Sequence, residues 1–410
     1  MKYYSLYYIS LFLLLSSSTF SQDSLNKPKI NFSFGGFVNA CAIYDSRQIV
    51  EVRDGFMAFY PKNKQTDKDG KDINSKPSLN QYAMTTRLNV KVNGPDAFGA
   101  KSIAFVEGDF TGASNSENNS LRLRHAYIKL SWNRTQLLIG QYWHPLDVPE
   151  ALPNVVSLNT GAPFHSFSRQ PQVRFDHQFW KFNLVLVASS QRDYMNTGPT
   201  GASSNYLRNS VIPNLHSQLH FTFKQHILGI AADYKRLTPR LVTDSNFKAN
   251  ESFDSYSYSA FAKFSFPVMN LKLQGIYGQN LYDHSMMGGY GVSSIDTLTN
   301  RKKYSSLNYI SAWLNIMTNG KRWKFGVFAG YLKNLGTIKD ISGSMYARDA
   351  DIYYLYRISP MAMLSSGKVN LSAECEYTLA AYGVPDSRYH FKQSKEYTNL
   401  RFTLSATYNF

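Results

Sequence analysis

The stretch YTNLRFTLSATYNF, residues 397–410, decides the fold of this chain. Its apolar residues occupy every second position: Leu400, Phe402, Leu404, Ala406, Tyr408 and Phe410. Polar residues fill the positions between them, and successive side chains of a β-strand point to opposite faces. The stretch therefore predicts a strand with one apolar face and one polar face. A single strand of this kind fits a soluble sheet as well as a membrane barrel, so the rest of the chain must distinguish the two.

Segments with the same alternation recur along the chain between turn residues. The sequence predicts sixteen of them, at residues 30–43, 81–93, 101–111, 121–132, 135–143, 170–179, 180–190, 215–224, 226–236, 254–266, 268–281, 304–317, 321–334, 349–359, 368–382 and 397–410. An even number of such segments is typical of a transmembrane β-barrel. The predicted fold is therefore all-β, a transmembrane antiparallel β-barrel of about 16 strands, which is wide enough for a water-filled lumen.

The connections between these segments alternate between short and long. Short ones include residues 318–320 and 360–367, whereas long ones include residues 44–80, 144–169 and 383–396. Transmembrane barrels have short periplasmic turns and longer outer loops. If both termini lie in the periplasm, all eight long connections lie on the outside. Nothing in a soluble β-sandwich requires the short loops to lie at one end and the long loops at the other.

The N-terminus carries an export signal. An apolar run, residues 9–15, is followed by Thr19-Phe20-Ser21, which has the small residues that a signal peptidase reads. The run is far shorter than the ~20 residues that a membrane helix needs, so we expect residues 1–21 to be a cleaved signal peptide. Residues 22–29 then form a short periplasmic segment. We expect residues 30–410 to form a single barrel in the bacterial outer membrane.

The formal net charge is +16, from 44 Lys and Arg against 28 Asp and Glu. Such a balance often indicates nucleic acid binding, but here the basic residues occur singly among the strands of an exported protein. We therefore expect no nucleic acid partner. The expected partners are small anionic solutes, the lipid bilayer and the phosphates of lipopolysaccharide. The two cysteines, Cys41 and Cys375, exclude a disulfide scaffold.

The charged residues of the strands fall on the faces opposite the predicted lipid-facing sides, so they would line water. By this assignment thirteen are basic and six are acidic, and such a lumen would concentrate anions. The residues expected to line the pore and set its selectivity are Arg87, Glu107, Asp109, Arg122, Arg124, Arg174, Asp176 and Arg401. In the densest part, an acidic pair on one strand lies beside arginines of the next strand. One interpretation is that these groups create a transverse electric field across the pore. The other is that they neutralise one another as salt bridges along the wall, and the two interpretations are compatible.

The third long connection, residues 144–169, contains four prolines and eight large apolar residues, which is too apolar for a loop surrounded by water. Folding into the barrel would bury these side chains and narrow the pore. The alternative is an outer loop packed on a neighbouring subunit. In the first case, which we favour, Glu150, His165 and Arg169 are the candidate constriction residues.

Several stretches resemble the DcaP-like family of trimeric outer-membrane porins. They are GGFVNACAIYDSR (35–47), VEGDFTG (106–112), LRLRHAYIKL (121–130), LLIGQYWHP (137–145) and SRQPQVRF (168–175). The resemblance implies a sixteen-stranded barrel, a homotrimer, and a preference for small negatively charged solutes such as dicarboxylates. It also implies that Arg122, Arg124 and Arg174 line the pore. Relatives can carry an N-terminal coiled-coil extension, whereas residues 22–29 alone precede the first strand here, so we expect wall contacts to hold the trimer.

Three functions compete: a diffusion porin, a surface adhesin or assembly scaffold, and an enzyme built on a barrel. The sequence has no G-x-S-x-G, H-E-x-x-H or C-x-x-C motif, and we predict no catalytic residue, cofactor or metal site. An adhesin needs only a plugged barrel and not a charged interior. The sequence therefore favours a porin for passive diffusion of small hydrophilic, preferably carboxylate-bearing, solutes. Phe410 is expected to be read by the barrel-insertion machinery.

Overall fold

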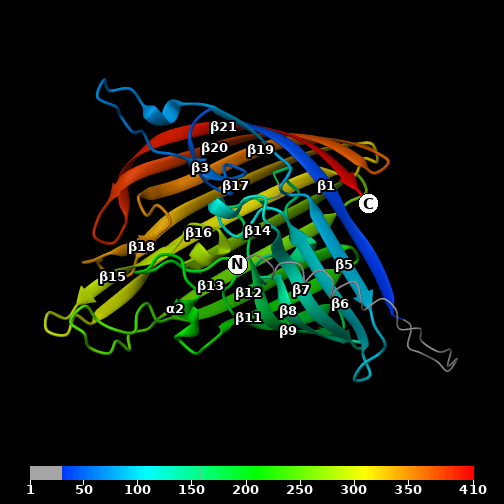
Figure 1. Cartoon of the computed structure of the whole chain (residues 1–410), viewed down its shortest axis with the longest axis horizontal. Coiled ribbons are helices and arrows are strands. Elements are labelled where there is room, and N and C mark those ends of the chain that lie inside the picture. The colour runs from blue at the N-terminus through cyan, green and yellow to red at the C-terminus, as the bar shows by residue number, and fades with distance from the viewer. Residues whose placement is uncertain (1–29, 158) are drawn as a thin grey trace, which may run out of the picture.

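The computed structural model describes residues 30–157 and 159–410. The predicted signal peptide, residues 1–21, and the segment 22–29 lie outside the described residues. The described chain forms a closed antiparallel β-barrel of sixteen wall strands, so the predicted fold class and strand number are confirmed (Figure 1). The wall strands are β1 (Asn31–Asp45), the broken strand β4 (Ser78–Tyr82) and β5 (Arg87–Asn93), β6 (Lys101–Asp109), β7 (Arg122–Ser131), β8 (Thr135–Trp143), β9 (Arg169–Phe179), β10 (Phe182–Ser189), β11 (Asn214–Phe223), β12 (His226–Leu237), β13 (Phe253–Ser265), β14 (Met269–Gln279), β16 (Lys302–Thr318), β17 (Trp323–Thr337), β19 (Ile352–Ser366), β20 (Val369–Pro385) and β21 (Phe391–Asn409).

The barrel closes between its first and last strands. β1 pairs with β5 through its first half and with β21 through its second half, and Figure 1 shows the blue β1 beside the red β21. Along β21, Leu404 is 63% exposed on the lipid side, whereas the neighbouring Thr403 is 2% exposed on the inner side. Closure matters because an unpaired backbone group in hydrocarbon costs several kcal/mol. The alternation of the closing strand thus separates lipid from lumen.

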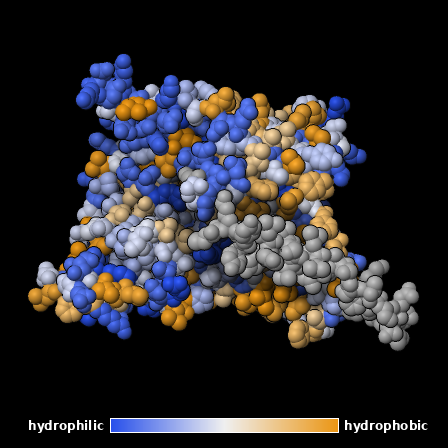
Figure 2. All heavy atoms as spheres, viewed as in Figure 1, coloured by the Kyte–Doolittle hydropathy of each residue, from blue (hydrophilic) through white to orange (hydrophobic). Residues whose placement is uncertain are grey.

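Hydrophobic side chains cover the outside of the strands, as a bilayer requires. Exposed residues of this kind include Phe175, Phe325 and Leu371, which lie on β9, β17 and β20. In Figure 2 hydrophobic residues gather toward the right of the visible face, and hydrophilic residues gather at its upper left, over the outer loop that contains η1.

The remaining elements lie in the connections between wall strands. They are β2 (Ile49–Val52), β3 (Met57–Pro61), η1 (Ile73–Ser75), η2 (Asn115–Glu117), η3 (Pro149–Ala151), α2 (Asn205–Arg208), η4 (Tyr282–His284), β15 (Gly289–Ile295) and β18 (Met345–Ala347). No helix in the described residues is long and apolar enough to cross a membrane. Three connections bear on the site, and we name them the first outer loop (residues 46–77), the third outer loop (residues 144–168) and the fourth outer loop (residues 190–213).

One predicted short connection is wrong. The sequence predicted a break at residues 360–367, but β19 continues through Pro360 to Ser366. A proline has no backbone N–H to donate, which normally confines it to strand edges. Here the ladder between β19 and β20 skips Pro360 and the residue before it and then resumes in the same register. The strand therefore accommodates the proline because the pairing between β19 and β20 is interrupted for two residues.

One predicted long connection is also wrong. Residues 383–396 were expected to form an outer loop, but β20 reaches Pro385 and β21 begins at Phe391. Only residues 386–390 connect the two strands. The polar composition of this stretch reflects a hairpin that extends beyond the lipid, where both of its faces meet water.

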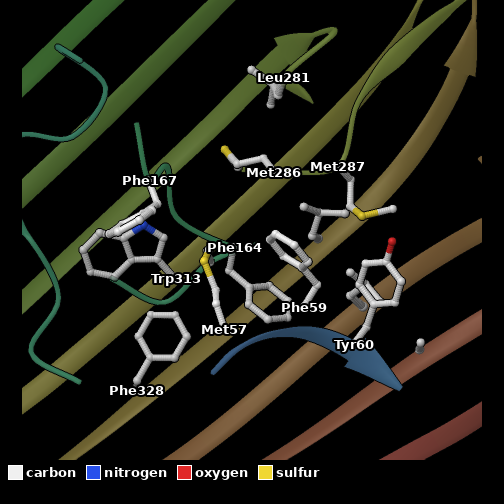
Figure 3. Packing of buried hydrophobic residues seen from close by; sticks show 14 of the residues in the cluster. Met57, Phe59, Tyr60, Phe164, Phe167, Leu281, Met286, Met287, Trp313 and Phe328 are labelled. Atoms are coloured by element: carbon white, nitrogen blue, oxygen red, sulfur yellow. The ribbon is translucent and has the colours of Figure 1, made fainter. Parts of the chain in front are cut away.

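Two outer loops fold into the barrel and build a hydrophobic core there, together with Leu281, Met286 and Met287 of the connection after β14. The third outer loop contributes Phe164 and Phe167, and the hairpin β2–β3 of the first outer loop contributes Met57, Phe59 and Tyr60 (Figure 3). They pack against inward-facing wall residues, including Trp313 of β16 and Phe328 of β17. The infolding predicted for the third outer loop is confirmed. The infolding of the first outer loop was not predicted.

Candidate functional site

A β-bulge sets the charged face of β7. Glu107 of β6 pairs with His125, and the next residue, Gly108, pairs with Leu123, so Arg124 is the extra residue of the bulge. A bulge shifts the alternation of a strand by one residue. Arg122 and Arg124 therefore point inward before the bulge, and His125 points inward after it, and all three are buried. This irregularity concentrates basic side chains at one place on the inner wall.

These arginines form direct ion pairs with the acidic residues of β6. Arg122 Nη2 and Arg124 Nη1 lie 2.9 and 2.8 Å from Asp109 Oδ2. Arg124 Nε also lies 2.8 Å from Glu107 Oε1, and Arg87 Nε lies 3.7 Å from the same oxygen. The wall salt bridges considered as one interpretation of this pattern are therefore present. They hold the guanidinium groups in fixed positions across three adjacent strands.

Arg169, the first residue of β9, completes this group. Its guanidinium stacks on Trp143 at 4.8 Å and on Phe167 at 4.9 Å. Its Nη2 lies 2.7 Å from Asp193 Oδ2 of the fourth outer loop, and Asp193 Oδ1 lies 3.9 Å from Arg122 Nη1. We call Arg87, Arg122, Arg124 and Arg169 the arginine cluster. Its four positive charges face the three carboxylates of Glu107, Asp109 and Asp193, so one positive charge is in excess.

The arginine cluster lies under the infolded loops. A cavity of only about 20 Å³ remains beside it, enough for about one water molecule. Phe56 and Met57 of the first outer loop, Phe167 of the third and Tyr194 of the fourth line this cavity. The infolded loops therefore leave little open space beside the arginines.

A larger chamber, of about 400 Å³, lies at the periplasmic end of β7 and β8. Three basic residues and two acidic residues line it: Lys129, Arg134, Arg174, Glu150 and Asp176. Arg174 Nη2 lies 2.9 Å from Asp176 Oδ1. Two tyrosines, Tyr127 and Tyr142, add an aromatic wall to the chamber, in which their rings meet edge to face at 5.2 Å.

Two of the residues proposed from the sequence lie elsewhere. His165 belongs to the third outer loop but is 1% exposed, with Trp313 against its ring and Asp147 3.8 Å away. Burial lowers the pKa of His165 to about 3 and raises the pKa of Asp147 to about 8. The loop is thus anchored by a neutral polar group inside a packed core. His165 does not face the chamber.

Arg401 faces inward, but its guanidinium lies under the β2–β3 hairpin and is 1% exposed. It pairs with Asp45 at 2.7 Å and donates to the backbone carbonyls of Gly55 and Phe56 at 2.7 and 3.0 Å. Arg357 of β19 binds the same hairpin through the carbonyls of Ala58 and Phe59. These two arginines therefore hold a loop in place, and water does not reach them. A carbonyl acceptor can belong to any residue, so the sequence held no signal for this role.

The described residues contain no group of three or more His, Cys, Asp and Glu side chains arranged to hold a metal ion. The site consists of fixed charges beside a small cavity and a larger chamber.

Residues 22–226 match the family described as DcaP outer membrane protein. The chain belongs to this family. Family and fold together make it a channel protein of the bacterial outer membrane. No curated protein matches its sequence.

Solved structures of porins share the fold. The outer membrane channel DcaP of Acinetobacter baumannii is 17% identical, with a TM-score of 0.67 over 93% of this chain and 97% of that chain. The anion-selective porin from Comamonas acidovorans is 9% identical, with a TM-score of 0.56 over 93% of this chain and 100% of that one. The trimer form of OmpT from Vibrio cholerae is 9% identical, with a TM-score of 0.55 over 93% and 99% of the two chains. At these identities the likeness concerns the fold.

Proposed function

We propose that this channel passes small hydrophilic solutes and prefers anions that carry carboxylate groups. The observation that supports this preference most strongly is the arginine cluster, where four guanidinium groups meet three carboxylates beside a small cavity on the inner wall. Fixed positive charge in a narrow, low-dielectric passage attracts anions and raises the barrier for cations. Guanidinium groups also bind carboxylates through two parallel hydrogen bonds.

The chamber supports the same preference on the periplasmic side. Its three basic side chains outnumber its two acidic ones. Arg174 and Asp176 neutralise each other, which leaves Lys129 and Arg134 opposite Glu150. An anion that leaves the arginine cluster therefore enters a space that is also weakly positive. A passage with the same sign of charge along its length admits one sign of ion throughout.

The experiment is single-channel recording in planar bilayers with a KCl gradient. Reversing Lys129 and Arg134 to Glu should shift the zero-current potential toward the cation side, because it changes the chamber from one excess positive charge to three excess negative charges. The matched control reverses Lys62 and Lys64, two exposed lysines of the first outer loop. Equal shifts in the two double variants would show that selectivity does not depend on the chamber.

We also propose that the chain forms a homotrimer, because OmpT of Vibrio cholerae, which shares the fold, has a trimer form. Native mass spectrometry of the detergent-solubilised protein tests this, and a monomer as the main species would contradict it.

A further inference from the structure

Asp193 reaches the arginine cluster from a different part of the molecule than the other acidic residues. Glu107 and Asp109 belong to the wall strand β6, whereas Asp193 belongs to the fourth outer loop. Its side chain is 6% exposed, and its two carboxylate oxygens lie toward Arg169 and Arg122. A carboxylate on a loop therefore occupies a position between two pore arginines.

The position differs from an ordinary wall salt bridge because Arg169 has so few other partners. Within the described part of the chain, Asp193 is the one carboxylate within ion-pair distance of Arg169, and the three guanidinium nitrogens make no hydrogen bond of good geometry. The faces of the guanidinium are covered by Trp143 and Phe167, so its N–H edge is held in one orientation. By contrast, the N–H edge of Arg401 is used by Asp45 and two backbone carbonyls.

The part of the fourth outer loop that carries Asp193 is attached by single side-chain contacts and not by a strand ladder. Gln170 accepts a hydrogen bond from the backbone N–H of Arg192 and donates one to the carbonyl of Tyr194. Gln191 donates to Asp283 at 2.8 Å. Moving this segment breaks these hydrogen bonds and the contact between the rings of Tyr194 and Phe167, which lie 5.8 Å apart, but it breaks no strand pairing of the barrel wall. A segment outside the strand ladders opens at a lower free-energy cost than the strands of the wall.

We propose that Asp193 is a tethered competitor that occupies the carboxylate-binding position formed by Arg122 and Arg169, so that a solute carboxylate must displace it to pass. This inference rests on the proposed anion preference and names the residue that tunes it. A group tethered by a flexible segment competes at an effective concentration in the millimolar range. Solute carboxylates at millimolar concentration can therefore exchange with Asp193, whereas trace anions leave it in place.

The test is block of chloride current by succinate, a small dicarboxylate used here as a probe, in single channels of the full-length protein. Asp193→Asn keeps the size of the side chain and removes its charge. It should lower the half-blocking succinate concentration about tenfold, the effect of removing one charged hydrogen-bond competitor. Asp193→Glu restores the charge and should return the half-blocking concentration to near the wild-type value. The control is Asp340→Asn, which removes an exposed loop carboxylate that pairs with Arg388.

The outcomes separate this inference from the proposed function. If the wild type is anion-selective but D193N and D340N have the same half-blocking succinate concentration, the role of Asp193 is overturned and the anion preference stands. A D193N channel with weaker block or lower anion conductance would overturn it as well, because it would make Asp193 a structural support for the arginines. A cation-selective wild type would instead overturn the proposed function.

Discussion

Replacing Arg357 with Gln should release both infolded loops. The guanidinium donates to the carbonyls of Ala58, Phe59 and Ala162 at 3.3, 3.0 and 3.0 Å, and to the hydroxyl of Thr378 at 2.8 Å. Ala58 and Phe59 belong to the first outer loop and Ala162 belongs to the third, so one side chain connects both loops to the wall. Without it, the loops lose their shared attachment to β19.

The loss of stability in R357Q depends on the buried carboxylate that remains without a partner. Glu376 lies 3.9 Å from Arg357 Nη1 and is 2% exposed, so R357Q leaves a buried carboxylate without its positive partner. Each hydrogen bond to a charged group contributes about 1.5–3 kcal/mol, and removing one member of a buried ion pair costs about 3–5 kcal/mol. These contributions overlap. We expect R357Q to lower the free energy of unfolding by about 3–5 kcal/mol, with the loss concentrated in the loops.

Two assays separate the loops from the barrel wall. Heat-dependent mobility on gels reports unfolding of the barrel, and single-channel conductance reports the width of the lumen. R357Q should lower the unfolding temperature and raise the conductance. The double variant R357Q/E376Q removes the unpaired charge but not the loss of loop contacts, so it should recover part of the stability while the conductance stays high.

The control is R388Q, which breaks an exposed ion pair that water screens. It should change neither stability nor conductance. A wild-type conductance in R357Q would refute the account in which Arg357 holds the infolded loops, even if the protein were less stable.

The remaining predictions concern packing and pH. Phe164→Ala should cost about 3–5 kcal/mol of local stability, because the ring is fully buried, and limited proteolysis should then cut the third outer loop faster than in the wild type or in Phe98→Ala, whose ring is 87% exposed. His165 and His284 are buried, which lowers the pKa of each to about 3. The unfolded chain therefore binds protons below about pH 6.5 that the folded chain does not, so this stabilisation is complete above pH 6.5 and is lost as the pH falls toward 3. The melting temperature should decline over this range, and a flat profile from pH 6.5 to 4 would contradict the burial of these imidazoles. Asp147 acts in the opposite direction, because burial raises its pKa to about 8 and the folded chain holds a proton that the unfolded chain releases. The contribution of Asp147 to stability should therefore fall between about pH 4 and pH 8, so the difference in stability between the wild type and Asp147→Asn should decrease over this range in urea titrations at different pH values.

The barrel was predictable because a strand between lipid and water must alternate apolar and polar residues. Leu404 and Thr403 of β21 differ in exposure as their alternation indicates, and the apolar third outer loop lies inside the barrel as its composition predicted. Strand ends were harder to predict, because polar residues look the same in a loop and in a hairpin that extends into water, as at residues 383–396. Proline at residue 360 gave a false break because a strand ladder can skip a proline and resume beyond it.

The site was predictable in its residue types but not in its partners. The basic and acidic residues of β6 and β7 come together as expected, but the bulge at Arg124 that turns His125 inward has no signature in the sequence. The burial of Arg401 depends on a hairpin whose acceptors are backbone carbonyls. Asp193 is one acidic residue in a polar loop, and only the folded chain brings it to Arg169.

The most direct test of the central claim is the zero-current potential of the wild-type channel in a tenfold KCl gradient. The excess of positive charge at the arginine cluster and in the chamber predicts a potential with the sign of chloride permeation. A potential with the sign of potassium permeation would contradict the claim that these arginines set the selectivity of the pore.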